Sequence, residues 1–471
     1  MRVFSGVGLM RDEVNDAAEK RNNGTRQLLV LGLLSVVLPE VSMAANVGYG
    51  LSYSATHSDN ITLANTNPTP DWLSSTQAQV AWQENDTPTV AARLYSQLRF
   101  DEYARHTYDR QTYFLLNSAA TWLVTPAFSW TGEDYYGQVP INPFVSNTPN
   151  NLENVNVFTT GPNWAVQMDP LNTLELGARY SNFYSDTGAN GSNQGAAFAG
   201  WLFKFSPITV LSLNYHAQHS TYTQVAGNAG YDRQDLFFRA ITRRPYAALV
   251  TDLGNTWLNQ TGAQRLSGVY GRLLASRQLT EANTFSLSAQ STLTDTTEQV
   301  LSAGGVGLVN TGTIATTDVY RQDQLDVIFS HLRSYGLDSL HFYSYRMNYY
   351  TAPLDEKITG GDATLAFPLS ATLRGSVTGS YSRSYLYATS TVNWDGIEAA
   401  QLTYQARPNI FLGLLGQLTQ RQSTDAAFSY NEARFMLSIS YYSNFSLINS
   451  ASVAPPLIQR DAVERDLLFS R

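Results

Sequence analysis

Histidine is the first residue type to consider for chemistry, because its imidazole binds metals and exchanges protons near neutral pH. The sequence has six histidines, and only His216 and His219 lie close together. An H-x-x-H pair binds a metal when both rings project from one face of a helix, but this pair falls in a predicted strand. Residues three apart on a strand point to opposite faces. We therefore predict no metal site and no cofactor. We expect the histidines to lie in loops or on the inner, polar face of a closed sheet, which is its lumen.

Nucleophilic catalysis would need a Ser, a His and an orienting Asn or Asp in one constellation. Ser and Asn occur along the whole chain, and no G-x-S-x-G elbow accompanies them. The glycine-rich segment Gly304-Gly305-Val306-Gly307 lacks the Lys and the strand-to-helix context of a phosphate loop. The chain is therefore predicted not to be an enzyme, with an outer-membrane hydrolase kept as an alternative.

Arginine is the charged residue type with the clearest pattern. Of the 30 basic residues, only Lys20, Lys204 and Lys357 are lysines. Six arginines fall on predicted polar strand faces and are candidate lumen-facing residues: Arg93, Arg99, Arg179, Arg346, Arg374 and Arg407. They could tune what passes through a lumen, or they could brace its wall by pairing with carboxylates. The net charge of −8 favours bracing over an anion pore and argues against a nucleic-acid partner.

The elements that must position these arginines are strands, because polar and apolar residues alternate along most of the chain. In 284–294, Phe285, Leu287 and Leu293 face one side and the Ser, Thr and Gln residues face the other. The segment 373–387 repeats this pattern with Tyr381 and Tyr385 on its apolar face. Alternation at every second residue is the signal of a strand with one buried face.

Strand length and composition distinguish a membrane barrel from a soluble sandwich. Several segments reach the 9–11 residues, roughly, that a membrane-spanning strand needs. Charged residues make up only 14% of the chain, and no run of about 18 apolar residues follows the N-terminal region. The sequence therefore predicts an all-β fold, a transmembrane antiparallel up-and-down β-barrel of roughly 16–20 strands. A soluble exported all-β binding protein is the alternative.

The N-terminal region has the order of a secretory signal peptide. Basic residues including Lys20 and Arg26 precede the apolar run 28–38, and Ser42-Met43-Ala44 offers a cleavage site. We assign 1–44 to the signal peptide; because its first part is acidic, translation from Met10 or later is an alternative start. Residues 45–442 are assigned to the barrel and 443–471 to a C-terminal tail on the periplasmic side.

The end of the assigned barrel has the pattern of a closing strand. Phe435, Leu437, Ile439 and Tyr441 alternate and end in an aromatic residue, as in strands that outer-membrane assembly machinery recognises. About thirty residues follow, so an additional strand in the tail is the alternative. The assembly machinery, membrane lipid and lipopolysaccharide are the partners expected from this arrangement.

Two short segments resemble a family of uncharacterised outer-membrane β-barrels associated with the PEP-CTERM system and exopolysaccharide gene clusters. The first is the glycine-containing start 47–52, followed by His57-Ser58-Asp59-Asn60-Ile61, and the second is Tyr231-Asp232-Arg233-Gln234-Asp235. The resemblance implies a bacterial outer-membrane channel or envelope component for exopolysaccharide export or surface sorting, with polysaccharide as a partner. It carries over no catalytic residue. A general diffusion porin is the alternative function.

Overall fold

The structure is a computed structural model of the chain. It describes residues 46–84, 87–142, 144–186, 191–222, 230–260, 265–303, 316, 318–333 and 336–452. The assigned signal peptide, the glycine-rich segment 304–307 and the end of the chain from 453 lie outside the described residues.

The described chain is built almost entirely of long strands. They are β1 (Asn46–Ser58), β2 (Asp71–Glu84), β3 (Val90–Tyr103), β4 (Gln111–Thr125), β5 (Phe128–Pro140), β6 (Leu152–Gln167), β7 (Asn172–Ser185), β8 (Ser192–Ser206), β9 (Thr209–Tyr222), β10 (Tyr231–Arg244), β11 (Ala247–Gln260), β12 (Leu266–Gln278), β13 (Asn283–Thr294), β14 (Tyr320–Arg333), β15 (Gly336–Tyr349), β16 (Glu356–Pro368), β17 (Leu373–Leu386), β18 (Thr391–Arg407), β19 (Ile410–Ser423) and β20 (Tyr430–Tyr442).

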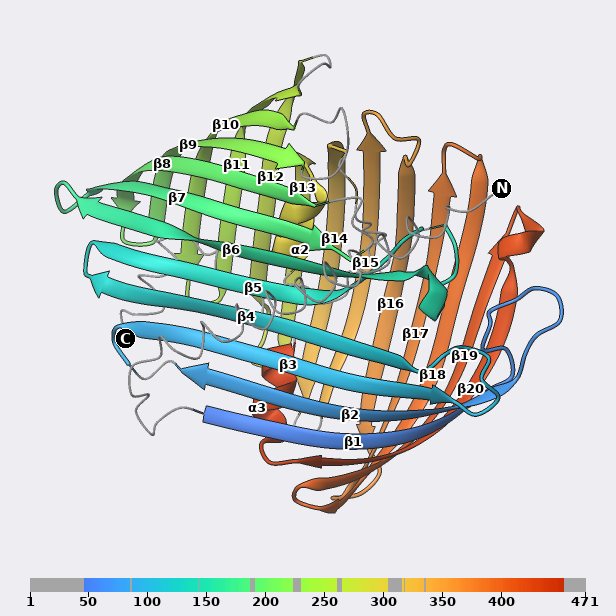
Figure 1. Cartoon of the computed structure of the whole chain (residues 1–471). Helices are drawn as coiled ribbons and strands as arrows, with labels where there is room; N and C mark the ends of the chain where they lie inside the picture. The colour runs from blue at the N-terminus through green and yellow to red at the C-terminus, as the bar shows by residue number, and fades with distance from the viewer. Residues whose placement is uncertain are drawn as a thin grey trace, which may run out of the picture. The chain divides into compact units, whose positions relative to one another are not determined.

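These strands form one closed barrel (Figure 1). Each strand pairs antiparallel with the next along the chain, and β20 pairs with β1 from Gly50↔Tyr442 to Ser58↔Arg434. The last pairing removes both sheet edges, so the backbone groups that would otherwise need a partner are hydrogen-bonded. The predicted fold class is confirmed, with 20 strands in the described sheet. The predicted closing strand is β20.

Alternation along each strand gives the barrel an apolar exterior. Leu253 on β11 and Leu365 on β16 are examples of large apolar side chains that remain exposed, at 62% and 58%. A soluble protein buries such residues against a second layer, but this barrel has one layer of strands. The wide belt of exposed apolar side chains therefore fits contact with lipid and does not fit the alternative of a soluble exported protein.

Aromatic residues mark both margins of this belt. Trp122, Trp130, Trp164 and Trp201 lie on the outer face near one end of the barrel and are each more than 40% exposed. Tyr350 and Tyr387 lie at the other end. Amphipathic rings are enriched where hydrocarbon meets the polar headgroups, so the two girdles mark the two membrane interfaces.

The two ends of the barrel differ in the length of their connections. At one end, strands are joined by tight turns such as 126–127, 207–208 and 408–409. At the other end lie longer connections, including 59–70, 104–110 and 295–319. In bacterial barrels the long loops are extracellular and the short turns periplasmic. β1 begins and β20 ends at the short-turn end.

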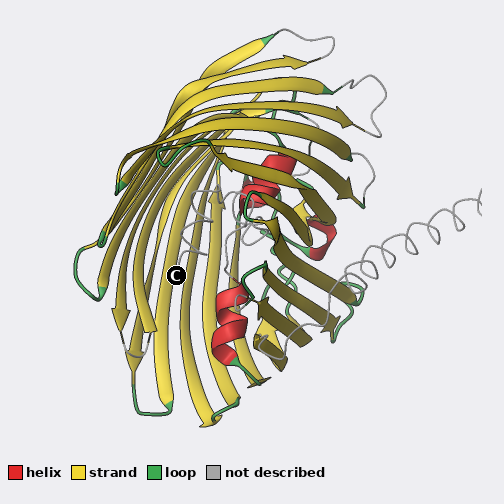
Figure 2. Cartoon of the chain, turned by 90° about the vertical axis from the view of Figure 1, so that its left-hand side faces the viewer, coloured by secondary structure: helices red, strands yellow, loops and turns green. Residues whose placement is uncertain are grey.

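The helices are short. They are η1 (Pro149–Asn151), α2 (Thr296–Ala303), η3 (Ala426–Phe428) and α3 (Phe445–Ser452). In the part of the chain that the structure describes, no helix has the length and apolar character needed to cross a membrane. Figure 2 shows α2 and α3 within the ring of strands.

The helix α3 takes the place of the additional strand that we considered for the tail. Leu447 and Ile448 are buried against Ala81 and Tyr95 on the inner face of β2 and β3. A side chain at Gly48 on β1 would meet Ile448, so glycine at this position lets the helix approach the wall. The described part of the tail, 443–452, therefore packs inside the short-turn end of the barrel.

Candidate functional site

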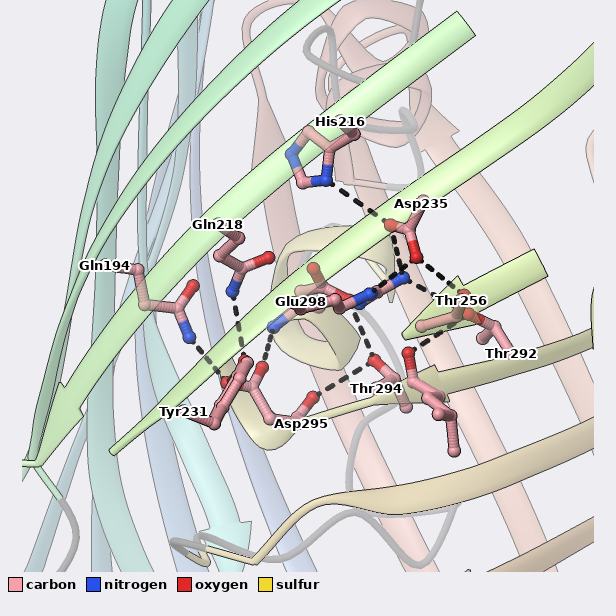
Figure 3. Close-up of polar contacts among 12 residues, drawn as sticks. Gln194, His216, Gln218, Tyr231, Asp235, Thr256, Thr292, Thr294, Asp295 and Glu298 are labelled. Carbon is pink, nitrogen blue, oxygen red and sulfur yellow. Dashed lines mark hydrogen bonds and ion pairs between the residues drawn. The ribbon is translucent and has the colours of Figure 1, made fainter. Parts of the chain in front are cut away.

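Directly after β13, Asp295 and α2 lie against the lumen wall at the long-loop end (Figures 1 and 3). Asp295, which directly follows β13, caps the helix by accepting a hydrogen bond from the backbone N–H of Glu298 at 2.9 Å. The other carboxylate oxygen of Asp295 accepts from the Tyr231 hydroxyl at 2.6 Å and from the Gln194 amide at 2.5 Å. One side chain therefore both starts α2 and ties it to β10 and β8.

A second connection is ionic. Arg233 on β10 pairs with Glu298 on α2, and it also pairs with Asp235 on its own strand at 3.0 Å. Arg233 is almost completely buried. A buried guanidinium needs such partners, because leaving it unpaired away from water is costly. The pair therefore holds α2 against β10 at a fixed position.

Other residues in the first half of α2 are tied to further parts of the chain. Gln299 accepts a hydrogen bond from the Tyr320 hydroxyl on β14, and Thr297 shares a hydroxyl contact of 3.2 Å with Ser192 on β8. The hydroxyl of Thr296 bonds the backbone of Thr316. Hydrogen bonds and an ion pair to β8, β10 and β14 therefore fix α2 on the inner face of the barrel.

The environment of Asp295 changes its acidity. Burial, followed by the negative charge of Glu298, raises the pKa of the Asp295 carboxyl to about 6. Its hydrogen bonds from Tyr231 and from the Glu298 backbone act in the opposite direction but are weaker. The carboxyl that caps α2 therefore changes its charge within a pH range that bacteria encounter.

Deeper in the lumen, charged groups pair across β10, β11 and β12. The Asp252 carboxylate accepts hydrogen bonds from Nε and Nη2 of Arg239, at 2.6 and 2.9 Å, and from Nε of Arg272 at 2.9 Å. Asp235 accepts from the Thr256 hydroxyl at 2.6 Å. These carboxylates brace the wall, which is the structural role that we considered for the arginines.

An aromatic track lies on the inner face of β15. His341, Tyr343 and Tyr345 follow one another at every second position, and the two tyrosine rings stack with centroids 5.2 Å apart. The Tyr345 hydroxyl donates to Asp326 at 2.6 Å. His341 lies between two carboxylates, with Nε2 at 3.1 Å from Asp326 and Nδ1 at 3.0 Å from Asp362. The track therefore combines ring faces with fixed acceptors.

Four of the six arginines named from the sequence lie on the inner face. Arg99 pairs with Asp101 at 3.3 Å and lies over the Tyr113 ring. Arg179 donates to Asn163 at 2.6 Å. The register also places Arg93 and Arg374 on inward positions, through the pairs Gln83↔Arg93 and Pro368↔Arg374. They line different parts of the wall and form no common cluster.

The other two arginines lie elsewhere. The register pairs Arg346 with Asp323 and Lys357, which puts it on the outer face beside exposed Phe342. The prediction that Arg346 faces the lumen is therefore wrong. Ser344 and Asn348 lie on the same face of β15, and because they are polar the sequence pattern indicated a lumen face. Arg407 is the last residue of β18, beyond a register shift, and is exposed at the short-turn end.

The residues that hold α2 were not named from the sequence as site residues. The segment 231–235, which carries part of the family resemblance, contains three of these residues. Alternation along β10 turns Tyr231, Arg233 and Asp235 inward, and all three belong to the network that holds α2. Figure 3 labels Tyr231 and Asp235 in this network. The partners Asp295 and Glu298 lie more than sixty residues away, and sequence spacing does not pair them.

The two close histidines point to opposite faces, as strand geometry predicts. His216 faces the lumen, where its Nδ1 lies 3.4 Å from Asp235, and His219 faces outward with its Nδ1 2.7 Å from Asp232. The described residues contain no group of three or more His, Asp or Glu arranged to hold a metal ion.

Comparisons with known proteins give similarity in fold only. Neither a protein-family model nor a curated protein matches the chain, so the resemblance to the PEP-CTERM-associated family has no support from them. Among solved structures, the siderophore receptor PirA from Pseudomonas aeruginosa is 11% identical, covers 85% of this chain and 80% of its own, and has a TM-score of 0.44. The FrpB iron transporter from Neisseria meningitidis is 9% identical over 84% of this chain and 82% of its own, with a TM-score of 0.43.

These scores are low, and the assignment of the barrel rests on its own register and closure. The closed antiparallel sheet, the apolar outer belt with its two aromatic girdles, and the polar inner wall define the chain as a membrane-spanning β-barrel. The inward-folded α2 and the lumen network define its candidate functional site.

Proposed function

We propose that this protein is an outer-membrane channel for hydrophilic solutes of carbohydrate character, acting in exopolysaccharide export or surface sorting in a bacterial envelope. The observation that carries the proposal is the attachment of α2 to the inner wall by Asp295 and Glu298. A barrel that served only as an anchor would not need a helix fixed on its inner wall, whereas a channel needs groups inside its lumen that select what passes.

The carbohydrate part of the proposal rests on the track of β15. Tyr343 and Tyr345 present stacked rings toward the lumen, and Asp326 lies beside them as an acceptor. Sugars have apolar ring faces and hydroxyl edges, so rings flanked by acceptors suit them. A general diffusion porin, our alternative, would not need such a track.

The test is conductance of the purified protein in planar bilayers. We expect stepwise conductance, and we expect neutral oligosaccharides to block it in a concentration-dependent manner. Tyr343→Ala should weaken that block by about tenfold while leaving the open conductance nearly unchanged. Arg407→Gln, at the rim and away from the track, is the matched control.

Each part of the proposal has its own contrary outcome. Absence of conductance in the wild type and in a double variant Asp295→Ala, Glu298→Gln would argue against a channel. Conductance that oligosaccharides block equally in wild type and Tyr343→Ala would favour a general diffusion porin.

A further inference from the structure

Two positive charges face each other on the lipid-facing wall of the barrel. Arg346 on β15 and Lys357 on β16 are direct cross-strand partners, and both side chains are exposed on the outer face. Like charges directly opposite each other in a sheet repel. Near the end of the strands the cost of exposing a cation on the outer wall is small, so the repulsion between the two charges is the unfavourable part of this arrangement.

No carboxylate within the described residues neutralises this pair. Arg346 donates to the Asn348 amide oxygen at 3.0 Å, and its guanidinium lies 5.9 Å from the centre of the Tyr387 ring. The acid opposite Arg346 is Asp323, which already pairs with Arg321 at 3.1 Å. The surplus positive charge therefore calls for an anion from outside the chain.

A third cation extends the group along the next strand. Arg383 on β17 is opposite Thr359, two positions along β16 from Lys357, and it is exposed on the same face. Its guanidinium lies 5.9 Å from the centre of the Trp394 ring. The three cations, Arg346, Lys357 and Arg383, form what we call the outer basic cluster.

The outer basic cluster borders a hollow in the barrel wall of about 920 Å³. Lys357 and Arg383 line it together with exposed apolar and aromatic side chains, notably Phe342 and Tyr381. Gly379 also lines it, and a side chain there would meet nothing within 4 Å. Among the described residues that line the hollow, Glu398 is the one outward-facing acid. The hollow is therefore apolar along its length and basic at one end.

The height of the cluster on the barrel indicates which part of a lipid it would meet. Arg346 lies three residues before the end of β15, Lys357 is the second residue of β16, and Arg383 lies three residues before the end of β17. All three are at the long-loop end, near the girdle residue Tyr387. In an outer-membrane barrel whose long loops are extracellular, as the proposed function requires, this end lies in the outer leaflet at the level of the headgroups.

We propose that the outer basic cluster and the adjoining hollow bind a phosphorylated glycolipid of the outer leaflet, with its phosphate on Arg346 and Lys357 and an acyl chain along the hollow. Arginine forms strong, directional hydrogen bonds with phosphate, and lysine adds a point charge. Basic pockets between membrane-spanning elements are known to hold anionic headgroups. The assignment to the outer leaflet rests on the proposed function, but the binding itself does not depend on conduction.

The test is native mass spectrometry of the purified, folded barrel titrated with lipid A that carries two phosphates. We expect the double variant Arg346→Gln, Lys357→Gln to bind at least tenfold more weakly than the wild type. Lipid A from which the phosphates have been removed should bind the wild type as weakly as intact lipid A binds the double variant. Arg374→Gln, which removes a lumen-facing cation, is the matched control and should bind like the wild type.

A second variant tests the contribution of the hollow to lipid binding independently of the charged residues. Gly379→Leu fills the hollow without touching a cation and should also weaken binding, whereas Gly416→Leu, on open outer wall away from the hollow, should not. The shift in gel mobility between unheated and boiled samples verifies that each variant is folded. Equal lipid binding by wild type and the double variant, or equal binding of phosphorylated and phosphate-free lipid, would overturn the proposal. Saturation by inorganic phosphate alone at the same concentration would also overturn it.

Discussion

The hydroxyl of Tyr231 donates a hydrogen bond of 2.6 Å to the carboxylate of Asp295, and this contact joins the first residue of β10 to the cap of α2. Tyr231 is almost completely buried, so the bond is shielded from water. We expect Tyr231→Phe to loosen α2 without unfolding the barrel, because the twenty-strand register does not depend on that hydroxyl. Increased noise of the open-channel current in planar bilayers would show the loosening. Tyr246→Phe, on an exposed turn, is the control, and equal noise in both variants would contradict this role.

The raised pKa of Asp295 predicts that α2 responds to pH. Its carboxyl has a pKa of about 6 in the folded protein, above the ordinary value of 3.8. The fold therefore favours the protonated form, and the stabilisation is complete below about pH 3.8 and lost as the pH rises through about 6. α2 should be held more weakly at pH 7 than at pH 5.

The chain has no cysteine, so a single spin label at Ser302→Cys can report the motion of α2. We expect the label to become more mobile between pH 5 and pH 7, with a midpoint near 6, in the background of the native Asp295. Asp295→Asn should remove the transition. A transition that persists in Asp295→Asn would show that another group controls it.

The carboxylate of Asp252 should matter far more for stability than an exposed carboxylate on the same barrel. Asp252 is fully buried and accepts hydrogen bonds from Arg239 and Arg272. Asp252→Asn would remove the anion that pairs with buried Arg239 and half-buried Arg272, and we expect a loss of about 3–5 kcal/mol in the free energy of unfolding. Asp323→Asn, which affects an exposed pair with Arg321, should cost about 0–1 kcal/mol. Urea unfolding in lipid vesicles measures both, and equal costs would contradict the bracing role.

Much of the fold could be predicted from the sequence, because the barrel is specified by a local pattern. Alternation along 284–294 and 373–387 identifies strands β13 and β17. It assigns the faces of β17 and of the start of β13 correctly, since each second residue meets either lipid or the lumen. Leu293, near the end of β13, was expected on the same face as Phe285 but is buried with Tyr231 and Leu258. The closing strand could also be recognised from Phe435 to Tyr441. The assignment was wrong for Arg346, because the outer face of β15 carries polar residues near the membrane interface, where charge is tolerated.

The candidate site could not be predicted in the same way. The pairing of Arg233 with Glu298 depends on a loop that turns back into the barrel, and no local pattern specifies that turn. The inward position of α3 depends likewise on small residues far away in sequence, Gly48 and Ala81, which leave space beside the wall. The contacts of α3 follow from the closure of the barrel, which brings together segments hundreds of residues apart.

Glycines in the wall provide a further prediction, because two of them differ sharply in what surrounds them. A side chain at Gly161 on β6 would collide with the backbone carbonyl oxygen of Ala178 on β7, whereas one at Gly271 on β12 would meet nothing within 4 Å. Backbone cannot move aside as a flexible side chain can, so we expect Gly161→Ala to destabilise the barrel by about 1–3 kcal/mol. Gly271→Ala should be neutral or slightly stabilising, since alanine restricts the unfolded chain. The temperature at which the folded band disappears from unheated gels should fall for Gly161→Ala alone.

The helix α3 allows the last prediction, because two of its apolar side chains are buried against the inner wall. Ile448 is 4% exposed and packs with Leu447 against Tyr95, while Ser446 on the same helix is exposed. Ile448→Ala removes buried apolar volume, which typically costs about 2–5 kcal/mol, and in this helix of eight residues Leu447 is the other side chain of the buried cluster. We expect α3 to leave the wall, conductance to rise, and protease added from the short-turn side to cleave within 443–452. Ser446→Ala should change neither measurement. Unchanged conductance in Ile448→Ala together with new cleavage would show that α3 packs in the lumen without limiting the flow of ions.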